Sequence, residues 1–103
     1  MKAETVRTIE RVVLDHHVET GDALSIPEIA ARVSWGETTV RAVVQASERL
    51  ELTHKYMLVM SEQVPGRVHQ RRSVDAYMPT RRWLREEIKT LARFRSMVEH
   101  RYG

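Results

Sequence analysis

Two short blocks of helical periodicity lie between residues 25 and 52. The apolar residues of the first block fall at i, i+3, i+4 and i+7, which places one stripe on a helix: Ile26, Ile29, Ala30 and Val33. The second block repeats this pattern with Val40, Val43, Val44, Ser47 and Leu50. Ser34-Trp35-Gly36 interrupts the periodicity. The sequence therefore predicts two helices joined by a tight turn, the second running from Glu37 to about Glu51.

Local capping signals support this pair of helices. Ser25 and Glu28 have the spacing of a capping box, which would start the first helix. Gly36 is an acceptable N-cap for the second helix. Trp35 lies in the turn, where we expect it to pack in the core between the two helices.

The segment before this pair predicts another helix. Residues 5–19 place Val6, Ile9 and Val13 on one face, and Gly21 suits the position after the helix end. Ala23-Leu24 can then form a short edge strand.

The segment after the pair predicts a β-hairpin and a long last helix. Strands are expected at 53–61 and 73–78, and Val64-Pro65-Gly66-Arg67 has the composition of a type II turn. Thr80 can cap a helix that continues to about His100. The 103 residues thus predict a mainly α protein with a small antiparallel β-hairpin. Residues 1–79 form its first unit, and the C-terminal helix at 80–103 forms its second.

The helix pair resembles the helix-turn-helix of winged-helix transcription regulators. Ile29-Ala30 and Thr39-Val40-Arg41 are similar to the pattern of the PadR, MarR and GntR superfamilies. The turn departs from that pattern, because Ser34 stands where glycine is usual, and a serine at positive φ is unfavourable. The resemblance implies a winged helix-turn-helix fold, with helix 37–51 in the DNA major groove and a hairpin wing at 62–72.

The polar face of the second helix carries side chains that can read bases. Glutamine can pair with adenine, arginine with guanine, and the methyl groups of threonine and alanine can meet thymine. The candidate base-reading residues are Thr38, Arg41, Ala42, Gln45 and Arg49. Glu37 and Glu48 flank this surface and weaken it, and an ordinary solvated helix face is the alternative interpretation.

Charge is unevenly distributed along the chain. Residues 1–51 hold six Lys or Arg against nine Asp or Glu, whereas residues 52–103 hold eleven against five. A basic, acid-poor second half is suited to binding phosphates. The candidate DNA contacts of the wing are Arg67, His69, Arg71 and Arg72. Charges on a hairpin can also serve to protect a sheet edge, but their density here favours DNA.

The last helix has a wide apolar stripe, and we expect it to form a homodimer interface. The candidate interface residues are Trp83, Leu84, Ile88, Leu91, Phe94 and Val98. The terminal helices of PadR- and MarR-like proteins also dimerise, so the resemblance points the same way. Packing of this helix back onto the first helix is the alternative.

Several classes of function are not expected. The chain has no cysteine, and His16 and His17 are adjacent, so they point in different directions on a helix. We expect no metal, no cofactor and no catalytic site. No apolar run is long enough for a membrane span or a secretion signal, so we expect a cytoplasmic protein.

The sequence therefore predicts sequence-specific binding of double-stranded DNA by a homodimeric transcriptional regulator, a repressor rather than an activator. Any effector, whether a small molecule or a protein, is left open. The alternative is a winged-helix module that contacts other proteins within a larger assembly, which the acidic flanks of the second helix favour.

Overall fold

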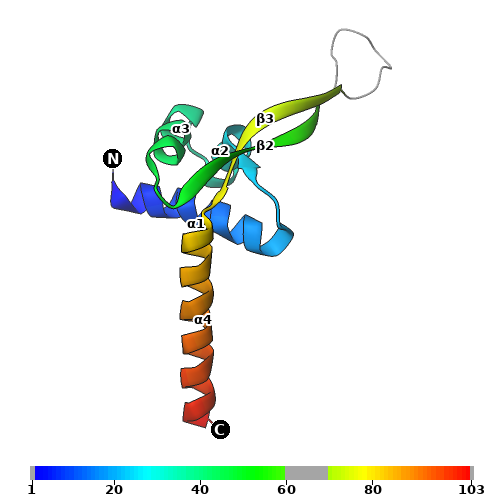
Figure 1. Cartoon of the computed structure of the whole chain (residues 1–103). Coiled ribbons are helices and arrows are strands. Elements are labelled where there is room, and N and C mark those ends of the chain that lie inside the picture. The colour runs from blue at the N-terminus through cyan, green and yellow to red at the C-terminus, as the bar shows by residue number, and fades with distance from the viewer. Residues whose placement is uncertain (1, 60–69, 103) are drawn as a thin grey trace.

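Four helices and three strands make up the computed structural model, which describes residues 2–59 and 70–102 (Figure 1). In chain order they are α1 (Ala3–Thr20), β1 (Leu24–Ser25), α2 (Ile26–Val33), α3 (Glu37–Ala46), β2 (Leu50–Val59), β3 (Gln70–Pro79) and α4 (Arg81–Tyr102). The fold is mainly helical, with a small antiparallel sheet and a C-terminal helix, as the sequence predicts.

The predicted capping signals are present at the helix ends. Ser25 Oγ accepts a hydrogen bond from the Glu28 amide, and Glu28 Oε1 accepts one from the Ser25 amide, which completes the capping box of α2. Gly21 follows α1 in the left-handed conformation, with φ 74°. Thr80 Oγ1 accepts a hydrogen bond from the Trp83 amide at 3.2 Å and so caps α4.

The predicted end of the third helix is wrong. α3 ends at Ala46 rather than near Glu51, and Ser47 has an extended backbone with ψ 126°. The Ser47 hydroxyl accepts a hydrogen bond from the Arg49 amide, which holds the chain in a turn. Leu50 then begins β2 and is buried there. Its apolar side chain fits the helical periodicity by coincidence, because a buried strand residue satisfies the same pattern.

The three strands form one antiparallel sheet in the order β1-β3-β2. Leu24 and Ser25 pair with Tyr77 and Ala76, which confirms the short edge strand predicted near residues 23–24. The β2–β3 ladder runs from Leu50 opposite Pro79 to Val59 opposite Gln70. β2 begins three residues before the predicted strand at 53–61, and β3 begins three residues before and ends one residue after the predicted strand at 73–78. The predicted turn at 64–67 lies outside the described residues.

A single core lies where α1, α2, α3 and the sheet meet. Its most deeply buried side chains come from each of these helices and from β1: Ile9, Val13, Leu24, Ile29, Val40, Val43 and Val44. α4 joins this core only through its first turns and then projects from the body, as does the far end of the β2–β3 hairpin (Figure 1). The radius of gyration, 17.4 Å, accordingly exceeds the value of about 13 Å for a compact chain of this length.

Candidate nucleic-acid interface

α3 has one buried face and one exposed face. Val40, Val43 and Val44 pack into the core and anchor the helix. The predicted base-reading residues on the helix, Thr38, Arg41, Ala42 and Gln45, are all exposed. The structure therefore leaves this polar face uncovered by the rest of the described chain.

The exposed face of α3 offers hydrogen-bonding groups of several kinds. Arg41 provides a guanidinium that has no carboxylate within ion-pair distance in the described part of the chain. Gln45 lies one turn further along the same helix and provides both an amide donor and an acceptor. Thr38 and Ala42 add small side chains, so a flat partner can approach the helix closely.

The placement of Arg49 on this face is wrong. Arg49 follows the end of α3, in the turn before β2. Its guanidinium lies 3.7 Å from Glu10 Oε1 and 5.5 Å from the centre of the Trp83 ring. A cation held by a carboxylate and an aromatic face is directed toward the body of its own chain. Arg49 therefore links the turn to α1 and α4 while its side chain stays 57% exposed, and α3 itself retains one arginine.

Glu10 connects this link to α1. Its side chain is buried, accepts a hydrogen bond from the Ser47 hydroxyl and lies beside Arg49. The Thr80 amide donates to the Arg49 carbonyl at 2.9 Å. The C-terminal end of α3 is thus connected to α1 and to the start of α4 by polar contacts as well as by packing. The sequence offers no signal for this cluster, because its members are distant along the chain.

The predicted wing residues are described only in part. Arg72 is exposed on β3, opposite Met57 of β2. Arg71 belongs to β3 by its backbone, whereas Arg67 and His69 lie outside the described residues. The structure thus describes one exposed arginine of this group, on the projecting hairpin.

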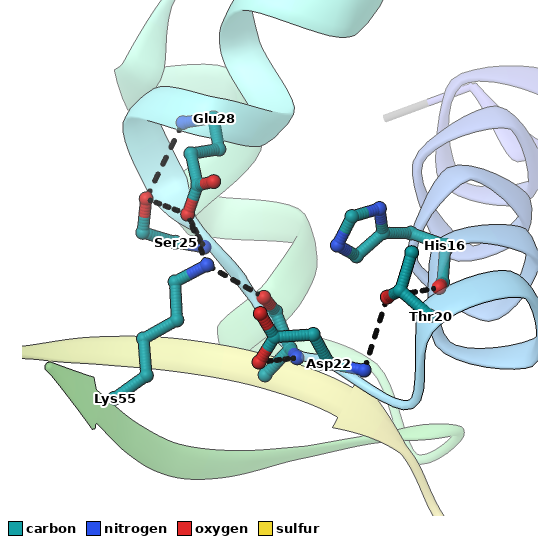
Figure 2. Close-up of polar contacts among 7 residues, drawn as sticks. His16, Thr20, Asp22, Ser25, Glu28 and Lys55 are labelled. Carbon is teal, nitrogen blue, oxygen red and sulfur yellow. Dashed lines mark hydrogen bonds and ion pairs between the residues drawn. The ribbon is translucent and has the colours of Figure 1, made fainter. Parts of the chain in front are cut away.

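The hairpin is attached to α2 by an ion pair that no sequence pattern predicts (Figure 2). Lys55 Nζ of β2 lies 2.6 Å from Glu28 Oε1 and donates a hydrogen bond to the Ala23 carbonyl at 2.8 Å. The Ser25 hydroxyl donates to the same Glu28 oxygen at 2.9 Å. Glu28 therefore has two functions, as it caps α2 and holds the hairpin.

The same contacts set the ionisation of Glu28. Burial by itself would raise the pKa of this carboxyl, but the hydrogen bonds from Lys55 and Ser25 and the positive charge of Lys55 outweigh it. The pKa of Glu28 consequently lies below its ordinary value. Glu28 is ionised at neutral pH, which maintains the attachment of the hairpin to α2.

Trp83 does not lie on the predicted apolar surface of α4. Its spacing predicts a place in the dimer interface, but its side chain is 6% exposed and belongs to the core of the single chain. Arg49 covers the face of its ring. A large aromatic residue in the first turn instead anchors α4 to the body.

The other candidate interface residues lie on α4 beyond this anchor. Leu84 is partly buried against the core, whereas Leu91 is 62% and Phe94 65% exposed. Ile88 and Val98 are exposed as well. These apolar side chains have little cover from the body, which packs against the start of the helix only.

A groove of about 380 Å³ adjoins this exposed stripe, where α1 lies beside the first half of α4. Arg11 pairs with Asp15 in α1 and also reaches Glu87 of α4 at 3.4 Å. The apolar lining of the groove comes from both helices: Leu14, Val18, Leu84, Ile88 and Leu91. The exposed stripe of α4 is therefore continuous with an apolar surface on α1.

The expected core position of Trp35 is also wrong. Its side chain is 38% exposed, and it lies outside the core cluster. Ser34 has the left-handed conformation, with φ 61° and ψ 34°, and ends α2 before the chain reaches Trp35. Ser34 thus takes the left-handed position where the resemblance would place a glycine, and the residue after it is an exposed tryptophan next to α3.

Residues 2–59 and 70–102 contain no cluster of three or more His, Cys, Asp or Glu side chains that could hold a metal ion. No helix in this part of the chain is long and apolar enough to cross a membrane. Comparisons of the chain with protein-family models, curated proteins and solved structures found no match.

Proposed function

We propose that this chain is a winged helix-turn-helix protein that binds double-stranded DNA as a homodimer and regulates transcription. The order of its elements supports the proposal, since three helices and an edge strand precede an antiparallel hairpin. In this interpretation α2 and α3 are the helix-turn-helix, α3 is the recognition helix, and the β2–β3 hairpin is the wing.

The uncovered polar face of α3 is the observation that carries the proposal. Its small and hydrogen-bonding residues face outward while the valines of the opposite face hold the helix rigidly in the core. A recognition helix needs both properties, because its outer side chains must reach base edges from a fixed support. Arg41 and Gln45 are the residues that we assign to base contacts.

The hairpin supplies the second part of the proposed interface. It projects from the body (Figure 1). Arg72 of β3 is exposed. The basic excess of the chain also lies in its second half, after α3. Arginines on such a projection suit the sugar–phosphate backbone or a narrow minor groove beside the major-groove helix.

The exposed stripe of α4 supports the homodimer. Leu91 and Phe94 would expose large apolar side chains to water in an isolated chain, and a second copy offers the same stripe and the same adjoining groove on α1. In such a dimer two recognition helices would lie about 34 Å apart, which fits two half-sites one helical turn apart.

A module for protein contact is the second candidate function. With Arg49 held by Glu10 and Trp83, Arg41 is the one arginine on α3, and Glu37 lies in its first turn. A weakly basic recognition helix favours a protein partner over DNA. The hairpin arginines favour DNA, and we rank DNA first for this reason.

A salt titration distinguishes the two candidates. We would measure binding of the full chain to a fluorescent duplex of random sequence by anisotropy at several salt concentrations. Phosphate contacts predict an affinity that falls steeply with salt. Arg72→Gln should reduce the slope by about one, whereas Arg93→Gln, which removes the same charge from an exposed position of α4, should leave it unchanged. Absence of binding at low salt would refute the DNA proposal.

A further inference from the structure

The two tryptophans of the chain have opposite environments. Trp83 is 6% exposed, lies in the core and is covered by Arg49. Trp35 is 38% exposed and contributes no side chain to the core cluster. Trp35 therefore leaves part of a large apolar side chain in water, and a partner that covers this part gains free energy.

The turn between α2 and α3 directs Trp35 away from the core. Ser34 ends α2 in the left-handed conformation, and its amide donates to the Ala30 carbonyl at 2.9 Å. The chain then becomes extended, and Gly36 is the N-cap of α3 with φ −65° and ψ 150°. Trp35 therefore lies directly before the first turn of α3, at the end of the helix that carries Thr38.

The indole N–H of Trp35 is available to an external acceptor. No hydrogen bond from it occurs within the described part of the chain. Trp35 itself is exposed, at 38%. An exposed apolar ring with one free donor matches a deoxyribose and its adjoining phosphate oxygen.

We propose that Trp35 contacts the DNA backbone at the N-terminal end of α3, with its ring against a deoxyribose and its Nε1–H donating to a phosphate oxygen. This inference rests on the proposed function. The N-terminal residues of a recognition helix lie closest to the bases, so the turn that precedes them lies beside the backbone. Backbone contacts fix the register of a helix in the groove without reading sequence.

Two substitutions separate the ring from its N–H group. Trp35→Phe keeps an aromatic ring and removes the donor, and we expect a loss of about threefold to tenfold in affinity for DNA. Trp35→Ala removes both contacts and should lower the affinity for DNA by roughly tenfold or more. For each variant, the loss of affinity should be the same for duplexes of different sequence, since the contact is to the backbone. A loss confined to particular sequences would overturn the assignment to the backbone.

Fluorescence provides an independent measurement. In Trp83→Phe the emission comes from Trp35 alone, and a saturating duplex should shift this emission and protect it from quenching by acrylamide. If Trp83→Phe does not fold, the same quenching measurement can be made on the parent chain, because the part of its emission that acrylamide quenches belongs to the exposed Trp35. Duplex binding with unchanged quenching and parental affinity of Trp35→Ala would refute the inference and leave the proposed function intact. Failure of the parent chain to bind any duplex would refute the proposed function itself.

Discussion

α3 and α4 are both amphipathic, but only α3 buries its apolar face within the chain. The valines of α3 lie in the core, and its outer face is small and polar. α4 is anchored by Trp83 and leaves Leu91 and Phe94 in solvent. The first arrangement leaves a polar surface that needs no cover, whereas the second leaves an apolar surface that does. This difference is our reason for assigning DNA to α3 and a second copy of the chain to α4.

The largest expected effect is at the buried face of α3. Val43→Asp places a carboxylate at a position that is 1% exposed, so its charge would be desolvated without a partner. We expect a loss of about 4 kcal/mol or more in the free energy of unfolding, measured by urea denaturation. The outward-facing Ala42→Asp is the matched control, and it should change this free energy by less than about 0.5 kcal/mol. Equal effects of the two changes would contradict the described burial of α3.

The same substitution on α4 should affect assembly instead of folding. Leu91→Asp adds a charge to the exposed stripe, so the single chain should keep its secondary structure and most of its stability. Sedimentation should show a dimer for the parent and a monomer for the variant. Arg93→Asp is the control. Arg93 also lies on α4 but is not one of the predicted stripe residues, so this variant should remain dimeric. A dimeric Leu91→Asp variant would exclude the α4 stripe as the interface.

A smaller effect is expected where the hairpin is attached to α2. Glu28→Gln keeps an oxygen that can accept the capping hydrogen bonds but removes the negative charge that faces Lys55, and we expect a loss of about 1 kcal/mol at neutral pH. Urea denaturation of the parent and the variant measures this difference.

The effect of Glu28→Gln should depend on pH. The pKa of Glu28 is lowered from its ordinary value of 4.5, so its ionised form stabilises the folded state. This contribution is fully present above the ordinary pKa and disappears as pH falls through the lower pKa of the folded state. The stabilities of parent and variant should therefore converge below pH 4.5. A constant difference at all values of pH would show that the charge is unimportant.

The smallest expected effect is at the turn before α3. Ser34→Gly relieves a left-handed conformation that serine rarely adopts, and it should raise the free energy of unfolding by about 0.5 kcal/mol. Gly21→Ala is the converse change, because Gly21 has φ 74° and open space around it. It should lower stability by about 1 kcal/mol. Stabilisation by both changes would contradict the backbone conformations described for the two turns.

Sequence reasoning succeeded where structure depends on neighbours along the chain. The Ser25–Glu28 capping box, the glycine after α1 and the Thr80 cap are all set within four residues, and each was predicted correctly. The antiparallel hairpin was predicted for the same reason, since two strand-like segments separated by a turn composition are a local signal.

The errors occurred where distant parts of the chain compete for a residue. Arg49 fits a helix surface by its spacing, but Glu10 and Trp83 hold it in a turn. Trp83 fits the stripe of α4, yet the core takes it because the body lies against the first turn of that helix. The Lys55–Glu28 pair joins a strand to a helix across 27 positions, and no local pattern indicates it. Tertiary contacts thus decided the roles of residues whose spacing alone was ambiguous.

The central claim, that two copies of α3 read DNA, is tested most directly by selecting duplexes that this protein enriches from a random pool. The account predicts a site with two-fold symmetry, whose half-sites lie about 10–10.5 base pairs apart or a multiple of that spacing. Gln45→Ala should change the preferred bases within each half-site, while the spacing between half-sites stays the same. Recovery of no common sequence, or of one that Arg41→Ala and Gln45→Ala leave unaltered, would contradict the assignment of α3 as the reading element.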